Sequence, residues 1–233
     1  MTEPRWGTVL FDFDGMLANT IPLILASYRW TIEQHDLPSM TDEQIRATIG
    51  RTLPDMMAEL GGPERVTELM DSYSAWQRDN VATYLESYPG LDGLLTELAA
   101  AGVRVGIATS RRRESAENLA GVLGINVPVL ATLEDTTEHK PLPAPLLLAA
   151  ERLGSEASDC AYVGDAVVDL QAARAAGMAG IGVTWGAGDP DALRAEPSVA
   201  VVDTVEELRA ALFARSLHHS DHTTSSLDRP AST

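Results

Sequence analysis

The chain has 233 residues, enough to bury a full hydrophobic core as one large domain or as one domain with an insert. Its formal net charge of −17 opposes association with nucleic acid and with anionic membranes, so we expect neither as a partner. No apolar run is long enough to cross a bilayer, the first residues lack the features of a signal peptide, and Cys160 is the only cysteine. We therefore expect a cytoplasmic protein, and the sequence leaves open whether it is a monomer or a homodimer.

Residues 8–13 predict a short buried strand that ends in acidic residues. Helical patterns without a clear strand follow over residues 17–88, which we expect to form an all-helical cap. Four helix starts are marked within it: Asn19 or Thr20 with Pro22 in the first turn, Thr41 with Gln44 as a capping box, Pro54, and Glu64 at the start of a helix that runs to about Leu85.

After Pro89-Gly90 the pattern changes to alternating strands and helices. Strands are expected at 103–109, 127–132, 159–164, 180–185 and 199–202, and helices at 91–101, 114–123, 144–153, 168–176 and 204–214. Short apolar strands joined by helices predict an α/β fold with a parallel sheet covered on both faces, built from residues 1–16 and 89–215. The polar tail at 216–233 is expected to be disordered.

Polar side chains follow each predicted strand that could flank a crevice. They are, in chain order, Asp12, Asp14 and Gly15; Thr109 and Ser110; Lys140; and Asp165 with Asp169 one helical turn later. The carboxyl ends of parallel strands meet at one edge of a sheet, where ligands bind in such folds. Lys140 stands out because the other sixteen basic residues are arginines and because an anion site in so acidic a chain needs local positive charge.

Carboxylates crowded at this edge would repel one another unless a cation lay among them, and oxygen ligands favour Mg²⁺. We expect Asp12 and Asp165 to bind the metal through their side chains and Asp14 through its backbone carbonyl, because Gly15 permits an abrupt turn. The side chain of Asp14 would then be free for proton transfer. Asp169 is either a further ligand or a residue that supports its helix and the ligands.

These groups suit phosphoryl transfer, which requires positioning, charge neutralisation and a nucleophile in line. An ionised Asp12 would attack phosphorus and form an aspartyl-phosphate, while Asp14 would protonate the leaving oxygen and later deprotonate the attacking water. Thr109 and nearby backbone N–H groups, including that of Ser110, would hold the phosphoryl oxygens. Lys140 would screen the charge of nucleophile and phosphate.

The motifs FDFDG at 11–15, Thr109, Lys140 before Pro141, and GDAVVD at 164–169 occur in this order, with intervals of 97 residues from Asp12 to Thr109, 31 from Thr109 to Lys140 and 25 from Lys140 to Asp165. In this the chain resembles the haloacid dehalogenase superfamily, in its branch of small phosphatases with a helical cap. The resemblance implies a Rossmann-like three-layer core with a mobile cap. The stretch from 162 to 186 is most similar to phosphoglycolate phosphatases and related pyrophosphatases, which implies phosphoglycolate-like compounds, pyrophosphate or sugar phosphates as substrates.

Other chemistries of this superfamily fit less well. A dehalogenase typically lacks the second motif aspartate, which is present as Asp14, and phosphonate cleavage needs a cap lysine, whereas Lys140 is the only lysine. An inactive binding protein would lack at least one of the motif residues. A phosphotransferase of the sugar-phosphate mutase type stays open as the alternative to a phosphatase.

Arginines and histidines outside the motifs carry weaker signals. Arg51 at the start of a predicted cap helix is either a residue that grips the far end of the substrate or a solvated arginine. The run from Arg111 to Arg113 is expected to form a surface patch at a helix start. The three histidines of the tail are not expected to bind a metal, because a disordered segment cannot preorganise ligands.

Overall fold

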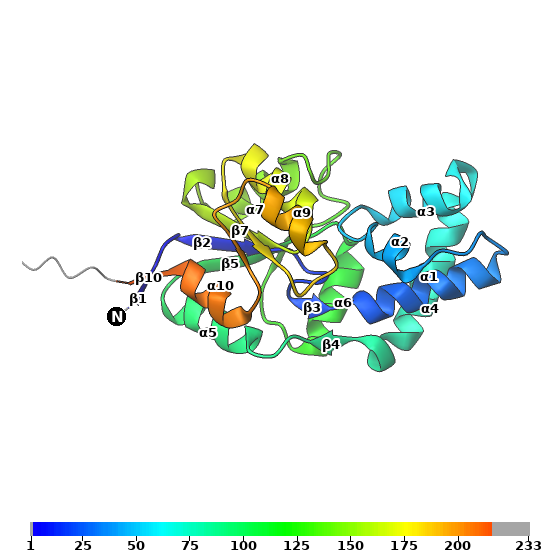
Figure 1. The fold of residues 1–233 in the computed structure, drawn as a ribbon, viewed down its shortest axis with the longest axis horizontal. Helices are drawn as coiled ribbons and strands as arrows, with labels where there is room; N and C mark the ends of the chain where they lie inside the picture. The colour runs from blue at the N-terminus through cyan, green and yellow to red at the C-terminus, as the bar shows by residue number, and fades with distance from the viewer. Residues whose placement is uncertain (1, 216–233) are drawn as a thin grey trace, which may run out of the picture.

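The computed structural model describes residues 2–215, and the predicted disorder of the tail concerns residues outside this range. A six-stranded parallel sheet forms the centre of the molecule, with helices on both faces (Figure 1). Its spatial order is β6 (Val129–Ala131), β5 (Arg104–Ala108), β2 (Thr8–Phe11), β7 (Cys160–Gly164), β8 (Ala179–Val183) and β9 (Ala200–Val202). The predicted α/β fold with a parallel sheet is therefore confirmed.

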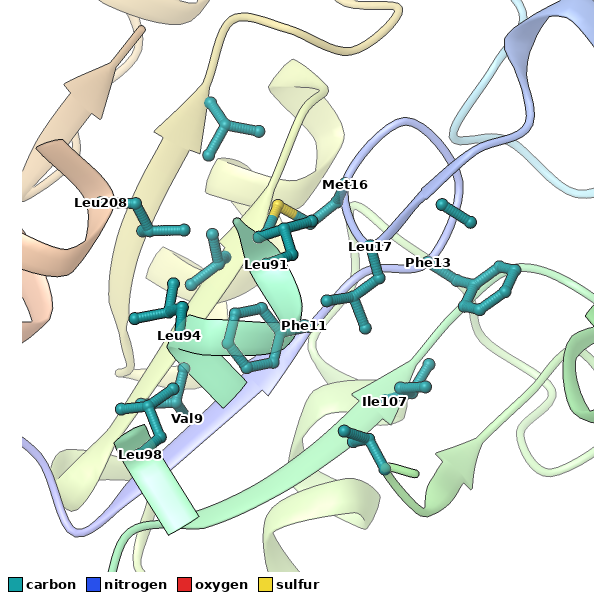
Figure 2. Packing of buried hydrophobic residues seen from close by; sticks show 14 of the residues in the cluster. Val9, Phe11, Phe13, Met16, Leu17, Leu91, Leu94, Leu98, Ile107 and Leu208 are labelled. Carbon is teal, nitrogen blue, oxygen red and sulfur yellow. The ribbon is translucent and has the colours of Figure 1, made fainter. Parts of the chain in front are cut away.

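Side chains of β2 alternate between the two faces of the sheet, as the pleat of a strand requires. Val9 and Phe11 pack beneath helix α5 and near Ile107 of β5 in one buried cluster (Figure 2). Leu10 belongs to a second cluster on the opposite face. The first face is covered by α5 (Leu91–Ala100), α6 (Arg113–Leu123) and α10 (Val205–Leu212), and the second by α7 (Ala144–Arg152) and α8 (Val167–Ala176). The three-layer arrangement follows from this packing.

A helical segment lies at one end of the sheet, with its own buried cluster (Figure 1). It comprises α1 (Ile21–Gln34), α2 (Asp42–Arg46), α3 (Leu53–Gly61), the 3₁₀ turn η1 (Pro63–Arg65) and α4 (Val66–Tyr84). The predicted starts are confirmed by Pro22 in the first turn of α1, by reciprocal capping between Thr41 and Gln44 at α2, and by Pro54 in the first turn of α3. Within residues 2–215 no side chain caps α1, and α4 begins at Val66, after the 3₁₀ turn that contains Glu64. We propose the division into a core at 1–16 and 89–215 and a cap at 17–88.

Several short elements differ from the prediction. Residues 17–88 are not free of strands, because β3 (Ala18–Asn19) pairs with β4 (Glu86–Ser87) where the chain enters and leaves the helical segment. The sequence also gave no expectation of the antiparallel pair β1 (Thr2–Pro4) and β10 (Phe213–Arg215), of helix α9 (Pro190–Ala195) or of the 3₁₀ turn η2 (Ala157–Asp159). No helix within residues 2–215 is both long and apolar enough to span a membrane.

Candidate active site

Asp12 lies directly beyond the carboxyl end of β2, at the centre of the sheet. Its backbone N–H donates to the carbonyl of Val163 in β7 at 2.8 Å, which extends the parallel pairing by one residue. The Asp12 side chain is only 3% exposed. Asp165 is equally buried and follows β7, so carboxylates at the ends of two neighbouring strands lie close together.

The chain turns sharply after Asp12, as the sequence predicts. Gly15 has a φ of 70°, in the left-handed region that glycine tolerates. A Cβ atom at this position would collide with the carboxylate of Asp165. Gly15 therefore permits both the turn and the close approach of Asp165.

Asp12, Asp165 and Asp169 form a buried group whose oxygen atoms lie within 4.8 Å of one another. Among the described residues, Oδ1 of Asp165 has no hydrogen-bond partner, and Oδ1 of Asp12 faces Lys140 without hydrogen-bond geometry. Unpartnered buried carboxylate oxygens are costly unless a cation binds them. The donor set is all oxygen, which fits Mg²⁺.

Both oxygens of Asp169 already have partners. Oδ1 accepts from Nζ of Lys140 at 2.6 Å, and Oδ2 accepts from the backbone N–H of Ala166 at 2.9 Å. These contacts favour the reading in which Asp169 supports the other groups over the reading in which it is a metal ligand.

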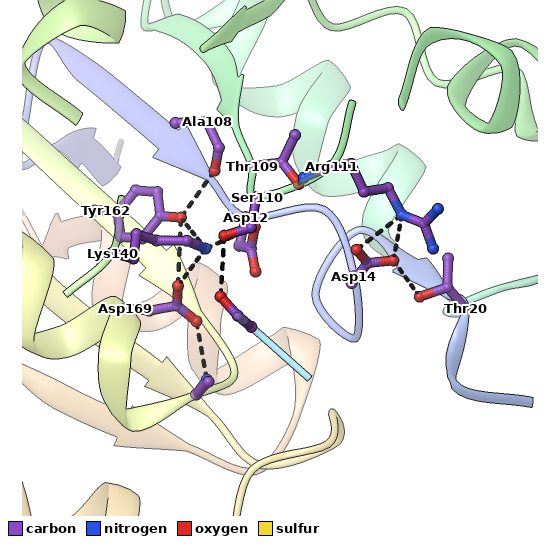
Figure 3. A network of polar contacts seen from close by, with 12 residues as sticks. Asp12, Asp14, Thr20, Ala108, Thr109, Ser110, Arg111, Lys140, Tyr162 and Asp169 are labelled. Atoms are coloured by element: carbon purple, nitrogen blue, oxygen red, sulfur yellow. Dashed lines mark hydrogen bonds and ion pairs between the residues drawn. The ribbon is translucent and has the colours of Figure 1, made fainter. Parts of the chain in front are cut away.

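Lys140 reaches the centre of this group, although it comes from the loop before α7. Its side chain is 2% exposed, and Nζ lies 3.0 Å from Oδ1 of Asp12 and 3.2 Å from the hydroxyl of Tyr162 (Figure 3). Tyr162 in turn donates to the carbonyl of Ala108 at 2.9 Å, so the lysine is anchored to β5 and β7. Tyr162 has no signal in the sequence beyond its place on a buried strand.

The pKa values of the site residues are shifted because three carboxylates are buried close to a single ammonium group. Burial raises the pKa of Asp12 to about 7, with Asp169 and Asp14 adding to the rise and Lys140 opposing it. Burial, then the charges of Asp169 and Asp12, raise the pKa of Asp165 well above its usual value. Burial alone would lower the pKa of Lys140, but Asp12 and Asp169 outweigh it and raise that pKa. A bound cation would relieve the repulsion that these shifts express.

The side chain of Asp14 is not free, contrary to the prediction. Nε of Arg111 lies 2.7 and 2.8 Å from its two carboxylate oxygens, and Oγ1 of Thr20 donates to it at 2.5 Å (Figure 3). The surface patch expected at 111–113 is therefore wrong for Arg111, which is only 10% exposed. No local pattern could show this, because the ion pair joins residues 97 positions apart.

Thr109 and Ser110 lie beyond β5, next to Arg111. Thr109 is buried, and its hydroxyl accepts from the backbone N–H of Arg111 at 3.2 Å. The hydroxyl of Ser110 donates to the carbonyl of Gly50 at 2.9 Å, which joins this loop to the one between α2 and α3. Arg51 is half-exposed and paired with Glu59 at 2.5 Å.

A cavity of about 450 Å³ opens beside Asp12, Asp14 and Thr109 and extends between α6 and the helical segment. Arg51 and Ser110 also line it, whereas the predicted residues Gly15, Lys140, Asp165 and Asp169 do not. Two lining residues that the sequence did not single out as site residues are Tyr73 and Gln77 of α4. Gln77 was not predictable because its role depends on a contact with Arg111 at 2.8 Å.

Comparisons with known proteins show the family of the chain. The family model described as haloacid dehalogenase-like hydrolase matches residues 9–183. The "Probable phosphatase IndB" of Dickeya dadantii is 35% identical over 88% of this chain and 93% of its own. A "Phosphoglycolate phosphatase" of Xanthomonas campestris is 34% identical (86% and 93%), and a "Pyrophosphatase PpaX" of Bacillus velezensis is 32% identical (79% and 86%).

Solved structures give the same result. A haloacid dehalogenase-like hydrolase from Bacteroides fragilis superposes with a TM-score of 0.78 at 29% identity, over 88% of this chain and 100% of that one. The chain is therefore an enzyme that belongs to the haloacid dehalogenase-like hydrolase family.

Proposed function

We propose that the protein is a Mg²⁺-dependent phosphatase that hydrolyses a small phosphorylated metabolite, such as a phosphoglycolate-like compound, pyrophosphate or a sugar phosphate. The observation that carries the proposal is the buried carboxylate of Asp12, which lies between Lys140 and a cavity and whose Oδ1 has no hydrogen-bond partner among the described residues. A carboxylate nucleophile needs no separate base to activate it.

In the proposed reaction an oxygen of Asp12 attacks phosphorus, and the bond from phosphorus to the leaving oxygen breaks. Asp14 gives its proton to that oxygen and then takes a proton from the water that attacks the aspartyl-phosphate. This role requires Asp14 to exchange its contacts with Arg111 and Thr20 for the substrate during turnover. Thr109 and the N–H groups beside it would hold the phosphoryl oxygens.

Mg²⁺ would be held by the side chains of Asp12 and Asp165 and by the backbone carbonyl of Asp14, where it would neutralise phosphoryl charge. Lys140 would add a second positive charge, kept in place by its ion pair with Asp169. The names of the relatives, a phosphatase, a phosphoglycolate phosphatase and a pyrophosphatase, support hydrolysis rather than the mutase alternative.

Phosphate release from phosphoglycolate, pyrophosphate and sugar phosphates, measured with Mg²⁺ and with EDTA, tests the proposal. We expect turnover of at least one substrate that requires Mg²⁺, and a loss of at least about 10³-fold in Asp12→Asn. Asp71→Asn is the matched control, because Asp71 is exposed on α4 and does not line the cavity. Undiminished phosphate release by Asp12→Asn would exclude Asp12 as the nucleophile.

A further inference from the structure

The cavity is larger than a phosphoryl group requires. Its volume is about 450 Å³. This lies within the range of cavities that enclose drug-sized ligands, about 300–1,000 Å³. Pyrophosphate or phosphoglycolate would leave most of the volume to water.

The wall opposite the catalytic aspartates is apolar. Ile24 of α1, Met56 of α3, and Tyr73 and Val81 of α4 line it from the helical segment, and Leu119 of α6 lines it from the core. All five side chains are nearly inaccessible to solvent. A substrate body that replaces water against this wall would gain hydrophobic free energy.

Most of the arginines that line the cavity form ion pairs with carboxylates. Of the four arginines that line it, three have ion pairs, namely Arg51 with Glu59, Arg111 with Asp14, and Arg112 with Glu134. Arg78 is exposed and has no ion pair within residues 2–215.

Both ends of the Gln77 amide also have hydrogen-bond partners. Its oxygen accepts from Arg111 at 2.8 Å, and its nitrogen donates to the hydroxyl of Tyr73 at 3.2 Å. The lining residues whose side chains have no polar partner within residues 2–215 are Arg78, Glu114 and Asn118, which are exposed, and Ser74, which is half-buried. The buried polar side chains of the wall therefore bind one another.

We infer that the substrate is a phosphate monoester whose leaving group has a bulky, apolar body, either aliphatic or aromatic. Its phosphate would lie at Asp12, and its body would lie against the wall formed by Ile24, Met56, Tyr73, Val81 and Leu119. This inference rests on the proposed phosphatase function and narrows its substrate class. The bonds that form and break are those already described, and the leaving group departs as an alcohol or a phenol.

The test is a series of n-alkyl monophosphates from ethyl to hexyl, assayed by phosphate release with Mg²⁺. Their alcohols have similar leaving-group pKa values, so a change in kcat/KM reports binding of the chain rather than chemistry. Burial of one methylene is worth about 0.8 kcal/mol, so we expect kcat/KM to rise about fourfold per methylene and about 200-fold over the series. A flat or falling series, or phosphoglycolate or pyrophosphate turned over better than hexyl phosphate, would overturn the inference.

The variant Ser74→Trp tests whether the dependence of kcat/KM on alkyl length arises in the cavity. Ser74 of α4 lines the cavity, and a larger side chain there would fill it. We expect the ratio of kcat/KM for hexyl and ethyl phosphate to fall at least about tenfold. Asp79→Trp places the same side chain on the exposed face of α4 and should keep the wild-type ratio. An unchanged ratio in Ser74→Trp would contradict binding at this wall.

The outcomes also separate this inference from the proposed function. Should Ser74→Trp fail to fold, the series measured on the wild-type protein still decides the question. Turnover of phosphoglycolate or pyrophosphate without dependence on alkyl length removes the inference and leaves the phosphatase. Absence of phosphate release from every compound, including p-nitrophenyl phosphate, removes both.

Discussion

The carboxylate of Asp14 is held by donors from two distant parts of the chain. Thr20 precedes α1, and Arg111 follows β5 and precedes α6. The guanidinium of Arg111 also donates to Gln77 of α4 at 2.8 Å and to Ser115 of α6 at 2.9 Å. Arg111 thus joins Asp14 to both walls of the cavity, and hydrogen bonds between charged groups fix geometry more strongly than neutral ones. We expect this residue to determine where Asp14 can move.

Replacement of Arg111 tests this positioning role. We expect Arg111→Met to lower kcat about 10- to 100-fold with a smaller effect on KM, because Asp14 is then oriented for proton transfer by the hydroxyl of Thr20 alone among the described residues. Arg111→Lys should recover part of the loss, since it keeps the charge but not the planar fork. Arg29→Met, which removes an exposed ion pair with Asp42, is the control and should leave both constants unchanged. Wild-type kcat in a folded Arg111→Met protein would contradict the role.

At the scale of elements, the loop between α2 and α3 closes against the core. The carbonyl of Gly50 accepts from Ser110. Gly50 has a φ of 97°, and a Cβ atom there would approach the side chains of Ala166 and Val168 to 3.2 Å. This loop therefore touches the segments that follow β5 and β7, next to the residues proposed for catalysis. Loops that close over an active site control access and water exclusion.

Ser110→Ala removes the hydroxyl that binds Gly50 and leaves the backbone N–H in place. A hydrogen bond of this kind contributes about 0.5–1.5 kcal/mol, so we expect amide hydrogen exchange in residues 47–52 to accelerate about two- to tenfold. The melting temperature should change little, because the sheet and its clusters are unaffected. Thr96→Ala, which removes a hydroxyl–carbonyl bond on the exposed side of α5, should leave exchange at 47–52 unchanged. Equal exchange in both variants would show that the contact does not hold the loop.

The elements that could be predicted are those with a strong local pattern. β2 is buried at every position and is apolar from Val9 to Phe11, and α2 begins with a capping box that is visible in the sequence. The pair β3 and β4 could not be predicted, because each strand has two residues and pairs with a segment 67 positions away. Asp189 followed by Pro190 is a start signal that could have identified α9.

The same distinction applies to the site. Parallel strands have their carboxyl ends at one edge of the sheet, so the meeting of Asp12 and Asp165, which directly follow β2 and β7, could be predicted from topology. The partners of Asp14 and Gln77 depend on how the helical segment packs against the core. That packing depends on contacts between side chains far apart in the chain, and no periodic pattern in the sequence predicts it.

At the scale of the whole molecule, three buried carboxylates that repel one another lie together in the site. The chain has a net charge of −17, and its most buried acidic group joins Asp12, at the end of β2, to Asp165 and Asp169, which lie more than 150 residues later. Lys140 is the one ammonium placed among them. A ligand that binds this group in the native state, but not in the unfolded chain where Asp12 is far from Asp165 and Asp169, stabilises the whole fold.

Mg²⁺ is accordingly expected to raise the melting temperature. At a free concentration of about 100 Kd a single site adds about 2.7 kcal/mol, which for a chain of this size corresponds to a rise of about 5–10 °C over the protein in EDTA. Asp165→Asn should abolish the shift, because it removes a carboxylate whose Oδ1 has no other partner among the described residues. Asp71→Asn, on the exposed face of α4, should keep the full shift and thereby exclude a general effect of divalent ions on so acidic a surface. An equal shift in both variants would place the stabilising ion outside the acidic group, whereas its loss in Asp165→Asn alone would link metal binding at the sheet edge to the stability of the fold.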